Sequence, residues 1–151
     1  MNARSSVSTP DSLRSNGARS MEMAGAQVHA RCHHVANVVT ITGNISPANL
    51  DQLAAYCGRF TLVGSPIVLD LTGVQRFSAS CVRLVNILEA QCNNTGIELA
   101  VVAHEVILDG LDGAGGGSIS TATAVPAALA YFTDAVTARR QMMLPFFAKT
   151  A

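Results

Sequence analysis

Apolar residues Val28, Ala30 and Cys32 alternate with polar residues from residue 27 onward. A period of two is typical of a β-strand with one buried face and one wet face, so we predict a strand over residues 27–32. A second strand is expected over residues 38–42. The polar link at residues 34–37 is too short for a crossover, so these two strands should pair antiparallel.

Beyond the second strand the apolar residues take up helical spacing. After a turn at residues 43–45, Ser46 and Pro47 are suited to cap and begin a helix. The residues at i, i+3, i+4, i+7 and i+10 form its apolar face. They are Leu50, Leu53, Ala54, Cys57 and Phe60.

A second helix is expected to begin near Ser78 and to end at residues 93–96. Its predicted buried residues are Cys81, Leu84, Val85, Leu88 and Cys92. A short helix is expected over residues 105–111 and a last helix over residues 125–140. The last helix is expected to bury Ala128, Leu129, Phe132 and Val136.

Two nearly continuous apolar runs lie between these helices and are typical of interior strands. The first covers residues 67–71 and should end at Thr72 and Gly73, and the second covers residues 97–103. A flexible loop at residues 113–117 and a short edge strand at residues 118–120 should follow. Helical crossovers predict an α/β fold, with a mixed and mostly parallel sheet of about four to five strands packed with about four helices.

Composition divides the chain into three parts. Residues 1–24 are rich in Ser, Arg, Asn and Gly and show no periodicity, so we expect a disordered arm. Residues 25–140 should form the domain, and residues 141–151 a C-terminal tail. The sequence is 49% hydrophobic and 13% charged, which is enough to bury a core.

Charge and cysteine content restrict the partners and the compartment. The ten basic and ten acidic residues cancel, which argues against nucleic acid or an anionic membrane as the main ligand. No apolar run approaches the roughly 20 residues that span a bilayer, and the first residues do not resemble a secretory signal. We therefore expect a cytoplasmic protein, with Cys32, Cys57, Cys81 and Cys92 as free thiols.

The residues with catalytic or metal-binding potential do not assemble into a recognised site. The glycine run at residues 113–117 does not satisfy G-x-G-x-x-G, because its last glycine position is Ser118. Cys32, His33 and His34 are adjacent, so on a strand they point to opposite faces and cannot easily share a metal ion. No G-x-S-x-G accompanies a serine nucleophile. We expect no enzyme activity, no cofactor and no metal.

Asp70 lies in an interior strand, where phosphorelay receiver domains carry their acceptor aspartate. Those domains also need further carboxylates after the first strand and a basic residue after the last strand. Here the first strand ends in histidines, and the chain's one lysine is Lys149. A structural role for Asp70 is the better interpretation.

Five segments together resemble the STAS domain family, whose founding members are bacterial anti-sigma factor antagonists. Residues 67–74, IVLDLTGV, resemble the family's V-x-L-D-L-S-x-V strand, and residues 77–82, FSASCV, its D-S-S-G-L turn. Residues 43–46 with Asn49 resemble its G-E-I-D…N stretch. Residues 96–99 resemble its G-x-x-L strand, and residues 127–129 the E-A-L of its last helix. The resemblance covers roughly residues 26–135 and implies the same α/β fold.

The resemblance also implies a partner and a switch. In that family a kinase-type anti-sigma factor docks on the turn and phosphorylates the first serine of D-S-S-G, which ends binding. The matching residues here are Ser78 for the Asp, Ala79 for the acceptor, Ser80 for the second serine and Cys81 for the glycine. Because Ala79 has no hydroxyl, the usual switch cannot operate there.

Three neighbouring groups remain as candidate modification sites. Ser78 or Ser80 could take the phosphate, although each presents its hydroxyl in a different direction from the acceptor. The helix dipole would favour a reactive thiolate at Cys81 if that residue were exposed. The alternative is that Cys81 is a small packed residue.

We therefore predict a non-catalytic regulatory domain, an anti-sigma factor antagonist that binds an anti-sigma factor. The alternative is a STAS-like sensory or scaffold module that binds a small ligand or another signalling protein. The predicted partner-binding residues come from two turns of the chain. They are Asn44, Ser46, Arg76, Phe77, Ser78, Ala79, Ser80, Cys81 and Arg83.

Overall fold

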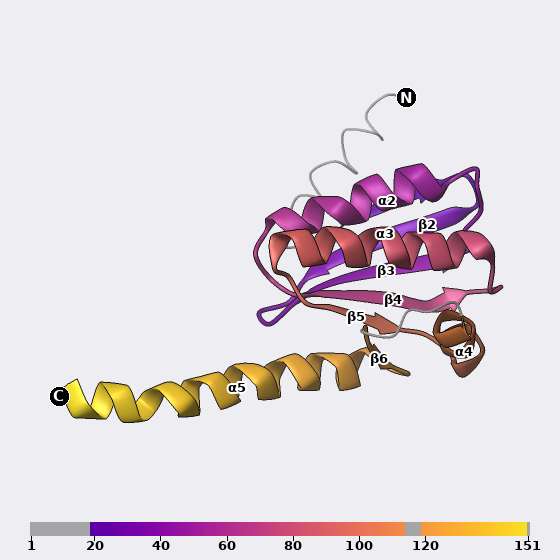
Figure 1. Cartoon of the computed structure of the whole chain (residues 1–151). Coiled ribbons are helices and arrows are strands. Elements are labelled where there is room, and N and C mark those ends of the chain that lie inside the picture. The colour runs from indigo at the N-terminus through magenta and orange to yellow at the C-terminus, as the bar shows by residue number, and fades with distance from the viewer. Residues whose placement is uncertain (1–18, 114–118, 151) are drawn as a thin grey trace, which may run out of the picture.

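A six-stranded sheet forms the centre of the molecule in the computed structural model, which describes residues 19–113 and 119–150 (Figure 1). The strands lie side by side in sequence order: β1 (Arg19–Met23), β2 (Ala26–Cys32), β3 (Asn37–Gly43), β4 (Ile67–Val74), β5 (Leu99–Val102) and β6 (Ser120–Ala122). β1, β2 and β3 pair antiparallel, and β3 to β6 pair parallel. Each parallel pair needs a crossover, so helices follow β3, β4 and β5.

Helices pack on both faces of this sheet (Figure 1). One face is covered by α2 (Leu50–Gly58), the short 3-10 helix η1 (Arg59–Leu62) and α3 (Ala79–Thr95). The other face packs against the first turns of α5 (Val125–Thr150), which then continues past the edge of the sheet (Figure 1). The helix α4 (Glu105–Gly113) lies at the end of the molecule where β4 ends.

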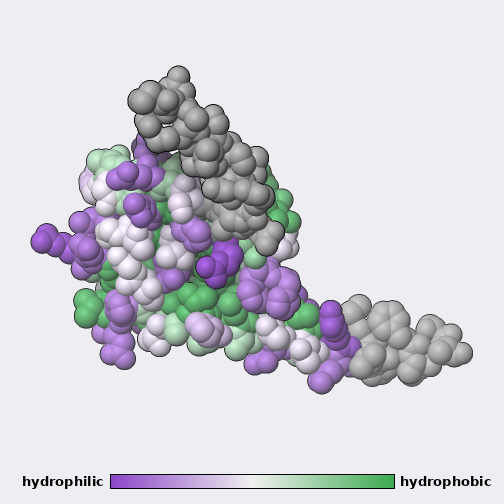
Figure 2. All heavy atoms as spheres, turned by 180° about the vertical axis from the view of Figure 1, so that it is seen from behind, coloured by the Kyte–Doolittle hydropathy of each residue, from purple (hydrophilic) through white to green (hydrophobic). Residues whose placement is uncertain are grey.

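Two apolar clusters hold these layers together. The larger lies between the sheet and α2 and α3, and includes Val39, Leu69 and Leu84. The smaller lies under α5, where Phe132 is 2% exposed. Figure 2 views the molecule from behind and shows apolar residues gathered on the surface beside the start of α5. Alternate residues of β4 enter each cluster, with Val68 in the smaller one. Burial on both faces explains why this strand is a nearly continuous apolar run.

Most of the predicted elements are confirmed. The antiparallel pairing of β2 with β3 is present, as is the start of α3 at Ser78 and its end at Gly96, which has a φ of 73°. The short helix after β5 is also present as α4. All of the cysteines are free thiols, with Cys32 exposed and the others buried.

The ends of the domain differ from the prediction. The expected disorder over residues 1–24 is wrong for β1, which pairs with β2 as the outermost strand; residues 1–18 lie outside the described part of the chain. The last helix does not end at residue 140 but continues to Thr150. Residues 141–144, Gln-Met-Met-Leu, are good helix formers, so the helix passes residue 140, and it also continues through Pro145.

Thr72 and Gly73 do not end their strand as predicted, because β4 runs on to Val74. β4 continues with a shift in its pairing with β3. Asp70 is opposite Thr40, but Gly73, three residues on, is opposite Thr42, two residues on. A Cβ on Gly73 would lie 2.5 Å from Thr42 Cγ2, so glycine is needed here for close approach between strands.

The remaining strand ends differ by a few residues. β5 is shorter than the predicted residues 97–103, and β6 begins at Ser120, where the predicted edge strand over residues 118–120 ends. Gly113 is the last residue of α4 and not the start of a loop. Residues 114–118 lie outside the described residues.

Candidate functional site

Two turns of the chain lie side by side at the end of the sheet where β3 and β4 end. The first turn, residues 43–49, leads from β3 into α2, and the second turn, residues 75–78, leads from β4 into α3. Gln75 N donates to Gly43 O at 3.0 Å, and Ser78 Oγ donates to Ile45 O at 3.0 Å. These contacts bring the predicted residues Asn44 and Ser46 next to the turn at Ser78.

Ser78 is the N-cap of α3, as predicted. Its backbone is extended, with φ −148° and ψ 163°, and its hydroxyl oxygen accepts from Cys81 N at 3.2 Å. The same hydroxyl donates to Ile45 O, so one side chain both starts the helix and joins the two turns. A serine is suited to this position because a hydroxyl can donate and accept at once.

The first turn is held by Asn49, which is fully buried. Its Oδ1 accepts from Ser46 N at 2.9 Å, and its Nδ2 reaches the carbonyl oxygens of Met23 at 3.2 Å, Ala24 at 3.2 Å and Asn44 at 2.9 Å. One amide therefore connects the first turn to the turn between β1 and β2. Carbonyl oxygens that would otherwise be buried without a donor are satisfied in this way.

This arrangement corrects the predicted helix start at Ser46 and Pro47. The N-cap of α2 is Asn49, and Ser46 O accepts from Asn49 N at 3.1 Å and Leu50 N at 2.9 Å. Residues 46–49 form a turn before the helix. Sequence reasoning missed the role of Asn49 because Ser-Pro is the stronger local signal, whereas the carbonyl groups that Asn49 bonds come from a distant segment.

Gly43, at the entrance to the first turn, has a φ of 93°. A Cβ there would lie 2.4 Å from Gly25 O, a backbone atom that cannot move aside cheaply. Both the left-handed backbone and the close approach require glycine at this position. The turn is therefore fixed at both ends, by Gly43 and by Asn49.

The predicted partner-binding residues differ in exposure. Ser46 and Ser78 are half-buried, while Ser80 and Cys81 point into the protein at 7% and 0% exposed. The others are exposed residues of the two adjacent turns and of the start of α3. They are called here the outer face, and they are Asn44, Arg76, Phe77, Ala79 and Arg83.

Burial contradicts the hypothesis of a reactive thiol at Cys81. Burial raises the pKa of the Cys81 thiol from 9.0 to about 11, because the thiolate would lose its hydration inside the core. The helix dipole would favour the thiolate, but desolvation outweighs it here. Cys81 is a packed core residue, which is the alternative that the sequence left open.

The neighbouring helix α4 contributes Gly110, which sequence reasoning did not select. A Cβ on Gly110 would lie 2.4 Å from Cε1 of Phe77, so the Phe77 ring rests directly on the backbone of α4. Phe77 nevertheless stays 40% exposed. A glycine inside a predicted helix is the one signal that pointed to such a contact.

Asp70 and the two adjacent histidines make local contacts in the structure. Asp70 Oδ1 accepts from Thr72 N at 3.0 Å and from Thr72 Oγ1 at 2.7 Å. This carboxylate therefore makes local hydrogen bonds within β4. The rings of His33 and His34 stack, with centroids 4.4 Å apart. Within the described residues, no three His, Cys, Asp or Glu side chains group as metal ligands.

No helix among residues 19–113 and 119–150 combines the length and the apolar character needed to cross a bilayer.

Comparison with known proteins places the fold and the two turns in context. The sequence pattern of the STAS domain matches residues 27–108. Osmosensory protein A of Mycobacterium tuberculosis (strain ATCC 25618 / H37Rv) is 35% identical in an alignment of 140 positions that covers 89% of each chain.

Two solved structures share the fold. One is an anti-sigma factor antagonist from Mycobacterium paratuberculosis, with a TM-score of 0.56 and 20% identity over 72% of this chain and 94% of that chain. The other is Moorella thermoacetica RsbS, with a TM-score of 0.62 and 13% identity over 73% of this chain and 97% of that chain. The pattern match covers more than half of the sequence, and it includes both turns. The chain belongs to the STAS domain family.

Proposed function

We propose that this protein is a non-catalytic anti-sigma factor antagonist that binds a kinase-type anti-sigma factor through its outer face. The observation that carries the proposal is the exposed start of α3, where Arg76, Phe77 and Ala79 face outward beside Asn44. An exposed aromatic residue between arginines has the composition of a protein-binding hot spot. The solved neighbour from Mycobacterium paratuberculosis, an anti-sigma factor antagonist, supports this choice of partner.

The usual serine switch is absent from this proposed interface. Ala79 occupies the acceptor position, is exposed and has no hydroxyl. The Ser78 hydroxyl already donates to Ile45 O and accepts from Cys81 N, and Ser80 is 7% exposed. A kinase that docks on the outer face would therefore find no free hydroxyl at the turn, and binding would persist in the presence of ATP.

The test uses the purified full chain with each ATPase-type anti-sigma factor of its host, with binding measured by calorimetry. The native chain should bind one of them, and ATP should leave the complex intact. Ala79→Glu should abolish binding, because it places a charge where the partner docks. Ala79→Ser should acquire one phosphate with partner and ATP, detected by mass spectrometry, and should then dissociate.

Ala79→Gly is the matched control, since it changes the same residue without adding charge or a hydroxyl. It should bind almost as tightly as the native chain. The proposal fails if the native chain binds none of these factors. The absence of a switch fails if the native chain takes up a stoichiometric phosphate on Ser78 or Ser80.

A second candidate function is a sensory module for a small ligand. The relative from Mycobacterium tuberculosis is named an osmosensory protein, and it matches 89% of this chain. A cavity of about 240 Å³ lies between α3, β6 and α5, and Glu89, Ser120 and Tyr131 are among its lining residues. A thermal-shift screen of small solutes separates the two functions, because only the sensory module should gain stability from one of them.

A further inference from the structure

Phe77 is an aromatic side chain held in an exposed position by a neighbouring helix. Its ring lies against Gly110 of α4, where no Cβ stands in the way, and it remains 40% exposed. Val106, one helical turn before Gly110, is 73% exposed. Because residues four apart share a helix face, Val106 extends the apolar surface that Phe77 begins.

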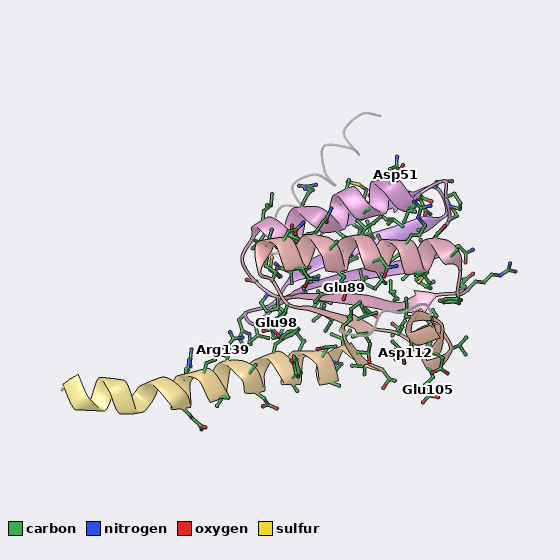
Figure 3. All side chains as sticks on the ribbon, in the orientation of Figure 1. Asp51, Glu89, Glu98, Glu105, Asp112 and Arg139 are labelled. Atoms are coloured by element: carbon green, nitrogen blue, oxygen red, sulfur yellow. The ribbon has the colours of Figure 1, made fainter. Side chains whose placement is uncertain are left out.

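The face of α4 next to this apolar surface is acidic. Glu105, Asp109 and Asp112 are all exposed, and their spacing of four and three places them on one stripe. Figure 3 labels Glu105 and Asp112 on this helix. Within the described residues, none of the three makes an ion pair, and neither do Arg76 and Arg83 of the outer face. The carboxylates are therefore free to pair with a docking protein.

One of these carboxylates lies where the helix itself disfavours it. Asp112 is in the last turn of α4, which contains no basic residue, and Asp109 precedes that turn. Negative charge at a helix C-terminus opposes the helix macrodipole, so Asp112 does not improve the stability of α4. A contact with another molecule accounts for a carboxylate at this position.

We propose that α4 is the second half of the docking surface, and that the partner protein covers Phe77 and Val106 with an apolar pocket rimmed by basic residues. The proposal rests on the proposed function, because α4 is continuous with the outer face through the contact of Phe77 with Gly110. Nucleic acid and anionic lipid do not fit, since their phosphates would face the acidic stripe. Basic residues on a protein would complement it.

The central experiment reverses the last two charges of the acidic stripe, at Asp109 and Asp112. The Asp109→Arg/Asp112→Arg variant should bind the anti-sigma factor at least about tenfold more weakly, mainly through slower association, because like charges now meet. Its melting temperature should equal or exceed that of the native chain, because arginines suit a helix C-terminus. Loss of affinity without loss of stability separates docking from folding.

The matched control reverses two exposed charges away from this surface, in the Glu22→Arg/Asp134→Arg variant. Glu22 lies on β1 and Asp134 on α5, and both are exposed. The control has the same net charge as the α4 variant, so it should keep native affinity. If both variants bound equally weakly, the loss of affinity would come from the overall charge and not from α4, which would overturn the proposal.

A second pair of variants tests the apolar centre. Phe77→Ala should weaken binding more than tenfold, as truncation of a central aromatic residue does. Gly110→Ala should also weaken binding, because its Cβ displaces the ring, while the better helix propensity of Ala keeps α4 folded. Native affinity in the Gly110→Ala variant would contradict the placement of the ring.

The outcomes distinguish this inference from the function on which it rests. If the native chain binds its anti-sigma factor and Ala79→Glu abolishes binding, but the α4 variant binds normally, only the role of α4 is wrong. If the native chain binds no anti-sigma factor, both are wrong. Sedimentation is the third measurement: a native dimer that the α4 variant dissociates would make a second copy of this chain the occupant, against the proposal.

Discussion

The two turns at the end of the sheet are neighbours, but they direct their polar groups in opposite directions. In the first turn the side chain of Asn49 is fully buried and contacts three carbonyl oxygens and one N–H. In the second turn Arg76 and Phe77 point outward, and Arg76 has no ion-pair partner among the described residues. Ser78 connects the two turns through Ile45 O.

This difference separates stability from recognition at one edge of the molecule. A buried, satisfied network fixes a backbone, since removal of any member leaves other groups unpaired. An exposed arginine or aromatic residue adds little to folding but can contribute much to binding. Substitution of Asn49 should therefore change the free energy of unfolding, and substitution of the exposed residues Arg76 and Phe77 should change affinity.

The largest effect is expected from Asn49→Ala. The change leaves the Ser46 N–H and the carbonyl oxygens of Met23, Ala24 and Asn44 without their partner in a buried site. Each unsatisfied buried group costs about 1–3 kcal/mol, and some will find water, so we expect a loss of about 3 kcal/mol. Urea denaturation followed by circular dichroism measures it.

Two further variants sharpen this result. Asn49→Asp keeps an acceptor for Ser46 N but places a carboxylate against three carbonyl oxygens, so it should not rescue stability. Ser46→Ala removes a hydroxyl that makes no hydrogen bond with the described residues, and it should lie within about 0.5 kcal/mol of the native chain. If Asn49→Ala had the same free energy of unfolding as the native chain, the hydrogen bonds of Asn49 would not be what holds the first turn.

Ser78→Ala should have an intermediate effect, because it breaks the link between the turns. It removes the cap of Cys81 N and the hydrogen bond to Ile45 O. The loss of a cap costs about 1 kcal/mol and the second bond somewhat less, so we expect about 1.5 kcal/mol in the same denaturation experiment. Ser78→Asp can still accept from Cys81 N but cannot donate to Ile45 O. Its stability should therefore fall between those of the native chain and the Ser78→Ala variant.

The sequence predicted the parts of this site that depend on local chemistry. Ser78 was identified as a cap, and the apolar period of α3 placed Leu84 and Leu88 in the core, because both depend on residues within a few positions. The interior strand β4 was also found from its apolar run, although its end was placed too early. There Gly73 serves strand contact and not a turn.

The parts that escaped prediction depend on residues far apart in the sequence. Asn49 bonds the carbonyl of Met23, 26 positions away, and Gly110 matters because of the ring of Phe77. β1 lacks a strong apolar period of its own and is stabilised by pairing with β2. Partners of this kind become visible only when the fold brings them together.

The smallest effect at neutral pH is expected for Cys81, which lies in the first turn of α3 and faces the core. Cys81 is fully buried directly behind the exposed Ala79, and its pKa is raised to about 11 by burial. In the native chain a thiol reagent at pH 8 should modify Cys32, the exposed cysteine, and should leave Cys81 unmodified until the protein is unfolded. Mass spectrometry of the labelled peptides measures this directly.

The burial of Cys81 also determines whether the free energy of unfolding rises or falls with pH. The unfolded chain releases the Cys81 proton near 9.0, whereas the folded chain holds it to about 11. The stability from a buried neutral thiol is therefore complete below pH 9 and is lost as pH rises from 9 to 11, at about 1.4 kcal/mol per pH unit. Cys57, whose pKa burial raises to about 12, adds a similar slope. Cys81→Ala should therefore reduce the pH dependence of the free energy of unfolding by about one proton between pH 9 and 11. An unchanged pH dependence would mean that the Cys81 thiol is exposed to solvent in the folded chain.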